Sequence, residues 1–233
     1  MSKKRIIHKK MHRFLLEKTT DFVRSYLSDG CFIESGVKQG TSSVIMSKSL
    51  NKKGYLFDTW KNFPHFSKVD AFSEKRKQKL QKRVKSKYNT FDSCVSNLKT
   101  NEVDHLCKMI QGDICKTIPD FIKINKDIPI CFIHSDSDLY EPTKVTLKSC
   151  WPSLLNGGII FVHDYGSRKW PGINKSINNF VKKVQSRIYV FDPKLLHSIV
   201  IIKNENNEFD NIFAKYIEYI EKTVEDNPLL WTK

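Results

Sequence analysis

Short apolar runs that alternate with helical stretches constrain this chain more than any other feature of its sequence. Residues 128–133 and 157–162 form nearly unbroken apolar runs, each long enough for one strand and far too short to cross a bilayer as a helix. Strands that are apolar on both faces are typical of a parallel sheet with helices on both sides. The sequence therefore predicts an α/β fold.

The same unit of strand followed by helix recurs along the chain, and 233 residues suit a single domain that covers 1–233. The two runs 187–191 and 198–202 are close enough in sequence to pair antiparallel. We expect five parallel strands, a terminal antiparallel hairpin and helices on both faces. The predicted parallel strands cover 31–33, 54–58, 105–110, 128–133 and 157–162, and the predicted helices cover 11–28, 42–50, 91–98, 114–124, 173–184 and 209–224.

The net charge of +15 is concentrated in two short segments. Residues 1–13 carry six Lys or Arg and no acid, and residues 74–87 carry eight against one Glu. These segments hold 13 of the 15 charges, and 33 of the 40 basic residues are lysine, whereas proteins that read base edges favour arginine. We interpret the second segment as part of a basic helical flap near 68–88, and nucleic-acid binding remains an alternative.

The cysteines and the basic N-terminal segment indicate in which cellular compartment the protein works. None of the six cysteines forms a C-x-x-C pair, and several lie in apolar runs, which fits a reducing environment. The basic residues 1–10 lead into an amphipathic run rather than the apolar core of a secretory signal. We therefore expect a cytoplasmic protein without a membrane segment.

Acidic residues follow nearly every predicted strand. In open parallel sheets ligands bind outside the carboxyl ends of the strands. One aspartate at such a place could simply cap a helix, but a series that converges on one edge indicates a binding site. The series consists of Glu34, Asp58, Asp113, Asp136, Asp138 and Asp164.

The loop that follows the first strand predicts a cofactor. Gly36 and Gly40 allow the backbone to approach a ligand at the start of the next helix. The spacing is not G-x-G-x-x-G, and the acid Glu34 at the strand end suits an ammonium group better than a pyrophosphate. Asp58 follows 24 residues later, near the usual offset for an acid that binds ribose hydroxyls. An ammonium and a ribose together indicate S-adenosylmethionine.

Several motifs within residues 30–182 resemble the macrocin O-methyltransferase family. They are Phe32-Ile33-Glu34-Ser35-Gly36-Val37, Phe57-Asp58-Thr59-Trp60, Gly112-Asp113, Asp136-Ser137-Asp138-Leu139-Tyr140-Glu141-Pro142-Thr143, and Gly157-Gly158 with Asp164-Tyr165-Gly166. The resemblance implies a Rossmann-like class I methyltransferase sheet, similar to that of the catechol O-methyltransferases. It also implies an S-adenosylmethionine-dependent, metal-assisted enzyme that methylates sugar hydroxyls.

The resemblance further implies roles for single residues on the cofactor side. Glu34 would hold the methionine amino group of the cofactor and Ser42 its carboxylate, near Gly36 and Gly40. Asp58 would bind the ribose, and Asp113 would form part of the adenine pocket.

On the metal side, the resemblance implies that Asp136, His163 and Asp164 bind a divalent ion, with Mg²⁺ the first candidate. His163 stands where the family leads us to expect a second adjacent aspartate. Mg²⁺ prefers oxygen ligands, whereas a histidine favours Mn, Fe or Zn. His163 could be a ligand, could be a general base, or could merely pack beside Asp164. Asp136 could serve as ligand and base, with His163 as the rival base.

The substrate predicted on these grounds is a hydroxyl of a nucleotide-sugar or a glycan. A methyltransferase for phenolic or other small-molecule hydroxyls is an alternative, although Leu139 stands where the catechol enzymes place a lysine. A basic nucleic-acid-binding protein or nucleic-acid methyltransferase is a second alternative, and a cofactor-binding chain that has lost catalysis is a third. The amphipathic helices near both ends could form a homodimer interface or cover the sheet.

Overall fold

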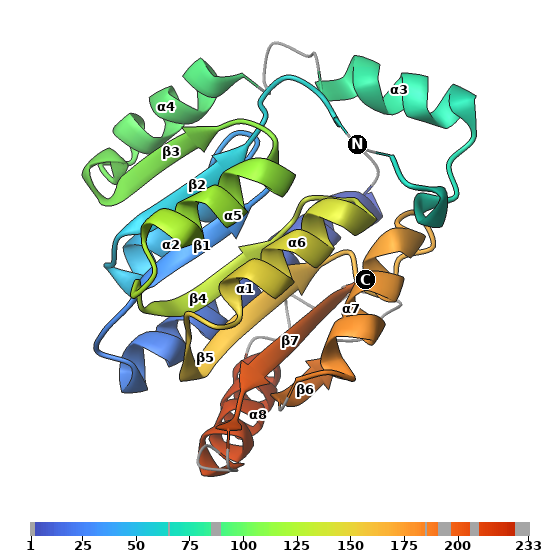
Figure 1. Cartoon of the computed structure of the whole chain (residues 1–233). Coiled ribbons are helices and arrows are strands. Elements are labelled where there is room, and N and C mark those ends of the chain that lie inside the picture. Colours follow the sequence, from blue (N-terminus) through green and yellow to red (C-terminus); the bar gives the residue numbers. More distant parts are fainter. Residues whose placement is uncertain are drawn as a thin grey trace.

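A seven-stranded sheet forms the centre of the computed structural model, which describes residues 3–64, 66–84, 90–184, 186–190, 197–205 and 210–226. The strand order is β3-β2-β1-β4-β5-β7-β6 (Figure 1). The first five of these strands run parallel, and β7 is antiparallel to both of its neighbours. This confirms the predicted sheet. The strands are β1 (Cys31–Ser35), β2 (Gly54–Asp58), β3 (Cys107–Gln111), β4 (Ile130–Ser135), β5 (Leu154–His163), β6 (Ser186–Val190) and β7 (Ser198–Lys203).

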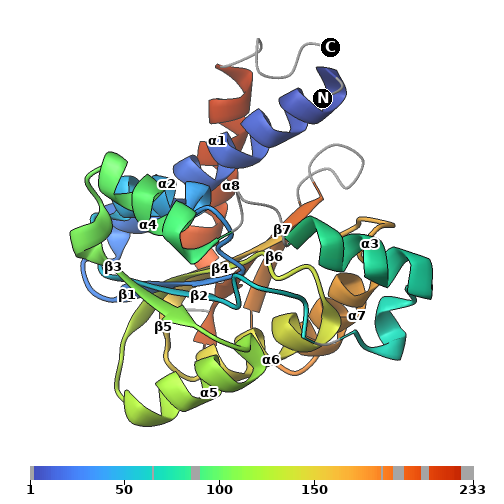
Figure 2. The same ribbon diagram turned by 90° about the horizontal axis from the view of Figure 1, so that it is seen from above.

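Helices cover both faces of the sheet, as predicted. Figure 2 shows α1, α2, α4 and α8 on one face and α5, α6 and α7 on the other. None of the helices in the described part of the chain is both long enough and apolar enough to cross a membrane. The helices are α1 (Lys3–Tyr26), α2 (Thr41–Leu50), α3 (Glu74–Val84), α4 (Phe91–Thr100), α5 (Ile114–Ile124), α6 (Tyr140–Cys150), α7 (Pro171–Val181) and α8 (Asp210–Glu225), with short 3₁₀ turns η1 (Lys68–Asp70) and η2 (Asp104–Leu106).

Two apolar cores lie on the two faces of the sheet. Successive side chains of a strand point to opposite faces, so each buried strand contributes to both cores. The core under α1, α2 and α8 takes the aromatic residues of the central strands, and the core under α5, α6 and α7 takes the neighbouring isoleucines. The first set is Phe32, Phe132 and Phe161, and the second is Ile33, Ile133 and Ile160, all fully buried.

Some element boundaries differ from the prediction. The first helix covers Lys3–Tyr26 rather than 11–28, because backbone hydrogen bonds can continue a helix beyond the apolar repeat from which it was predicted. The third parallel strand starts at Cys107, since a 3₁₀ turn occupies part of the predicted span. Within the predicted flap near 68–88, η1 precedes α3, which ends at Val84, and 85–89 lie outside the described residues.

The basic helix α3 packs against the rest of the chain along one side, although its sequence is polar on nearly all sides. Leu80 is buried, and the guanidinium of Arg76 lies 4.0 Å from the centroid of the Phe72 ring. The Nε2 of Gln81 donates a hydrogen bond of 2.7 Å to the carbonyl of Phe63. One buried leucine and one arginine that contacts aromatic rings are too weak a pattern to predict this docked face from periodicity.

Candidate active site

The carboxyl ends of β1, β2, β4 and β5 are aligned by their parallel registers. Ser35 at the end of β1 pairs with Phe57 of β2 and with Ser135 of β4, and Ser135 pairs in turn with Val162 of β5. Since each strand ends at the same edge, the segments that follow them meet there. Three of the acids predicted to converge at this edge lie in these segments, namely Asp136, Asp138 and Asp164. Glu34 and Asp58 lie near the ends of β1 and β2 themselves, and Asp113 follows β3.

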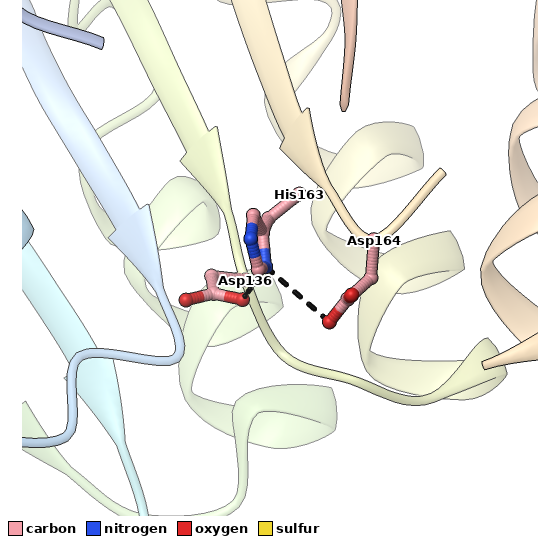
Figure 3. Close-up of side chains that lie close together, drawn as sticks. All are labelled: Asp136, His163 and Asp164. Carbon is pink, nitrogen blue, oxygen red and sulfur yellow. Dashed lines mark hydrogen bonds and ion pairs between the residues drawn. The ribbon is translucent and has the colours of Figure 1, made fainter. Parts of the chain in front are cut away.

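Asp136, His163 and Asp164 come together as one cluster (Figure 3). The Nδ1 of His163 lies 2.9 Å from Oδ1 of Asp136 and 3.3 Å from Oδ2 of Asp164. One donor atom from each residue lies within 4.8 Å of the other two. The Asp136 side chain is 32% exposed, so a ligand can reach the cluster. His163 therefore contacts both acids and does more than pack beside Asp164.

The electrostatics of this cluster favour a cation between the two carboxylates. Burial alone would lower the pKa of His163, but Asp136 and Asp164 hold that pKa well above its usual value. Burial would likewise raise the pKa of Asp136, and the neighbouring imidazolium instead lowers it. Two carboxylate oxygens and one imidazole nitrogen around a common point are also a donor set that fits a divalent metal.

Asp138 is a third acid of this centre. It was among the acids predicted at this edge, but no individual role was assigned to it. Asp138 and Asp164 both have left-handed backbone conformations, with φ of 66° and 64°. Burial, together with the charges of Asp164 and Asp136, raises the pKa of Asp138 well above its usual value. Unusual backbone conformations and perturbed acids tend to gather at functional sites. The spacing of Asp136 and Asp138, two residues apart in the sequence, was the signal that could have assigned Asp138 to this centre.

The loop between β1 and α2 is fixed by Asp58. Its Oδ2 accepts hydrogen bonds of 2.8 Å from the backbone N–H groups of Val37 and Lys38, and its Oδ1 accepts one of 2.9 Å from Trp60. Asp58 therefore holds the predicted cofactor loop against the end of β2. Its contact with a ribose remains a prediction.

Glycine is required where this loop passes over the segment that carries Asp136. Gly36 has φ of 90°, and a Cβ there would lie 2.3 Å from the carbonyl oxygen of Asp136. Gly40 has φ of 72° and occupies the N-cap of α2. The sequence predicted that these glycines let the backbone approach a ligand. In the structure, Gly36 lets the backbone approach another part of the chain, because the predicted cofactor loop packs directly on the segment that carries Asp136.

Glu34 is fully enclosed by partners from the chain. The side chain is 1% exposed, its Oε1 lies 3.0 Å from Nδ1 of His134, and its Oε2 accepts a hydrogen bond from the Ser43 hydroxyl. Burial raises the pKa of Glu34. The predicted contacts of Glu34 and Ser42 with the methionine end of the cofactor remain predictions. It is Ser43, the neighbour of Ser42, that bonds to Glu34.

Asp113 follows β3 and caps α5. Its Oδ1 accepts a hydrogen bond of 3.0 Å from the backbone N–H of Cys115, as expected of an N-cap aspartate. Its place at the carboxyl edge agrees with the predicted adenine pocket, and that role remains a prediction.

An open parallel sheet with a terminal antiparallel pair and acids gathered at its carboxyl edge defines the class I methyltransferase fold. Residues 33–165 match the family described as methyltransferase domain. The chain belongs to this methyltransferase-domain family, and it is an S-adenosylmethionine-dependent methyltransferase. No curated protein matches the chain in a sequence search.

Solved structures with the same fold include O-methyltransferases. CalS11, a calicheamicin methyltransferase, has a TM-score of 0.66 at 21% identity, and the match covers 84% of this chain and 79% of CalS11. Another structure of CalS11 describes it as a TDP-rhamnose 3'-O-methyltransferase. The O-methyltransferase NovP has a TM-score of 0.63 at 17% identity, covering 81% and 80%. An O-methyltransferase from Bacillus cereus in complex with SAH has a TM-score of 0.57 at 14% identity, covering 83% and 81%.

The Asp58→Asn substitution tests the cofactor loop. An amide offers one acceptor oxygen where the carboxylate offers two, so at least one backbone N–H in the loop loses a charge-assisted bond of about 1.5–3 kcal/mol. We expect the affinity for S-adenosylmethionine to fall about tenfold or more, measured by calorimetric titration. Asp92→Asn, an equal charge change on the exposed side of α4, is the matched control. Equal affinities in the two variants would contradict this assignment.

Proposed function

We propose that this chain is an O-methyltransferase that transfers a methyl group from S-adenosylmethionine to a hydroxyl of a sugar, with a divalent metal at Asp136, His163 and Asp164. The observation that carries the proposal is the convergence of these three donor groups beside the cofactor loop. The fold shared with CalS11, described as a TDP-rhamnose 3'-O-methyltransferase, supports the sugar as acceptor.

The reaction is a displacement at a sulfonium methyl group. When bound, S-adenosylmethionine supplies an activated methyl group: the carbon–sulfur bond breaks with its electron pair kept by sulfur, and a carbon–oxygen bond forms. The acceptor hydroxyl must lose its proton, which makes the acceptor the more demanding partner. Positioning of the two reactants supplies much of the rate, so the rigid edge of the sheet matters as much as any single group.

The residues of the cluster divide this work. A divalent metal would lower the pKa of a bound hydroxyl, and Asp136, His163 and Asp164 would hold it. Asp136 is exposed enough to accept the hydroxyl proton at a carboxylate oxygen. His163 is the other candidate base only after it has lost the proton that Asp136 and Asp164 favour on its ring. Because one of the three donors is nitrogen, the site favours Mn²⁺, Fe²⁺ or Zn²⁺ over Mg²⁺.

The position and the positive charge of the basic helix α3 support the proposal that the acceptor carries phosphate. Figure 1 shows α3 beyond the carboxyl ends of the strands, and Arg76 donates a hydrogen bond to the carbonyl of Lys169, in the segment that follows Asp164. The exposed Lys75, Lys79 and Lys82 lie on this helix. A pocket of about 430 Å³ at α3 is lined by Phe66, Glu74, Lys77, Gln78, Gln81 and Lys82. Lysines beside an aromatic ring suit the phosphates and base of a nucleotide-linked sugar.

The phenolic alternative has less support. Leu139, at the position where the catechol enzymes place a lysine, is fully buried at the start of α6. This position therefore offers no amine to take up the acceptor proton, and in the proposed reaction a group of the Asp136 cluster takes it instead.

Calorimetry followed by an acceptor panel tests the proposal. We expect micromolar binding of S-adenosylmethionine and no binding of NAD, because the loop lacks the dinucleotide pattern. Methyl transfer is then measured on nucleotide-sugars, free sugars and catechols, with and without chelator. Turnover of nucleotide-sugars that is lost with chelator supports the proposal. Turnover of catechols alone would overturn the sugar assignment.

Asp136→Asn separates chemistry from cofactor binding. The amide cannot accept a proton and is a poorer metal ligand, so we expect turnover to fall by about 100-fold or more while the affinity for S-adenosylmethionine changes by no more than about twofold. Turnover and calorimetric titration are measured on the same preparation. Loss of cofactor binding in this variant would mean that the reacting centre lies elsewhere.

His163→Asp tests the metal preference. Replacing the nitrogen donor with a carboxylate gives three acidic oxygen donors, so we expect the affinity for Mg²⁺ relative to Mn²⁺ to rise about tenfold. Calorimetric titration of each metal into chelator-treated protein provides the ratio. His163→Asn, which removes the imidazole without adding charge, is the matched control. A ratio that is the same in wild type and in His163→Asp would exclude His163 as a ligand.

A further inference from the structure

The N-terminal helix α1 carries a histidine into the active centre. His12 is 8% exposed, and its ring centroid lies 4.1 Å from that of His163 in an edge-to-face arrangement with an interplanar angle of 75°. No sequence motif pointed to this residue, since helix α1 precedes the strands that carry the predicted site.

His12 lies between the two halves of the centre. Besides His163, its neighbours are the ring of Phe161 at 5.4 Å and the ring of His134 at 5.8 Å. His134 bonds to Glu34 on the cofactor side, whereas His163 bonds to Asp136 on the metal side. One buried ring of α1 therefore contacts side chains at the ends of both β4 and β5.

The place of His12 is fixed by the anchoring of α1. Leu15 and Leu16 of this helix are buried in the core, and the Thr19 hydroxyl lies 3.0 Å from the Tyr216 hydroxyl of α8. A residue one turn before these anchors has little freedom to move away from the sheet.

The His163 ring needs such a neighbour. The χ2 torsion of histidine is broad and roughly two-fold, so a rotated ring would present carbon instead of Nδ1 to Asp136 and Asp164. The contacts with the two acids hold the ring only while Nδ1 carries a proton that it can donate, in the imidazolium or in the Nδ1–H tautomer. An edge-to-face contact restricts the ring in either protonation state, because it acts through packing.

We infer that His12 is a positioning residue that holds the His163 imidazole with Nδ1 toward the two carboxylates, which makes α1 part of the active centre. The part of the test that measures metal affinity rests on the proposed function, whereas the part that measures the His163 ring signals does not. The role requires an aromatic ring at position 12 and no proton transfer from it.

The test uses His12→Ala and His12→Phe in the full chain, with Thr19→Val as control. In metal-free protein, histidine ring signals are recorded by NMR at fixed pH, and the His163 signals are assigned by their loss in His163→Asn. The affinity for Mn²⁺ is measured by calorimetry. Thr19→Val loosens α1 at the hydroxyl pair with Tyr216 without touching His163, so it reports the effect of reduced stability alone.

We expect His12→Ala to shift and broaden the His163 signals and to weaken Mn²⁺ binding by about three- to tenfold, the size of one aromatic contact. We expect His12→Phe to restore most of the His163 signals and most of the Mn²⁺ affinity, and Thr19→Val to change neither quantity. The affinity for S-adenosylmethionine stays within about twofold of wild type in these three variants.

Unchanged His163 signals in His12→Ala would overturn the inference. So would a His12→Phe variant no better than His12→Ala, or a Thr19→Val variant with the same effects. Wild-type protein that fails to bind Mn²⁺ would count against the proposed metal, while the ring signals would still decide the role of His12.

Discussion

The parallel pairing of β4 with β1 on one side and with β5 on the other is the constraint on which the site depends. Because these registers are in phase, Ser35, Ser135 and Val162 lie at one level of the sheet. The residues after them have to share the space beyond that level. Buried apolar strands fix the registers, since a slip by one residue would turn the core side chains of each strand to the opposite face. The packing of the core thereby sets the geometry of the polar edge.

The second constraint is charge. Several acids brought to one edge repel one another, and each raises the pKa of the next, as Asp138 shows beside Asp164 and Asp136. In this chain the repulsion is relieved by a histidine between two carboxylates and by backbone N–H groups around Asp58. The same arrangement suits the proposed metal, because a divalent cation held by Asp136, His163 and Asp164 would supply the positive charge that the imidazolium now places between the two carboxylates.

The sheet and the position of the site could be predicted from sequence, because both follow from local signals. Apolar runs of strand length indicate buried parallel strands, and an acid directly after such a run must lie at the carboxyl edge. For this reason the strand pattern placed Asp136 and Asp164 at this edge. The resemblance to the macrocin O-methyltransferase family added His163 to them, and the three residues do lie together. The enclosure of Glu34 by Ser43 and His134 could not be predicted, because hydrogen-bond partners across strands depend on rotamers and on register.

The contacts that sequence reasoning missed join elements far apart in the chain. Arg76 of α3 packs on the ring of Trp170, which fixes a helix that periodicity describes as solvated, and His12 of α1 packs on His163 of β5. Neither pair has a periodic signature, since each depends on one side chain rather than on a repeated face. His12 contacts the candidate site directly, and Arg76 also bonds to Lys169 in the segment that follows Asp164. A strand pattern can therefore locate such a site. The side chains that helices contribute to its surroundings can be identified only from the three-dimensional arrangement of those helices.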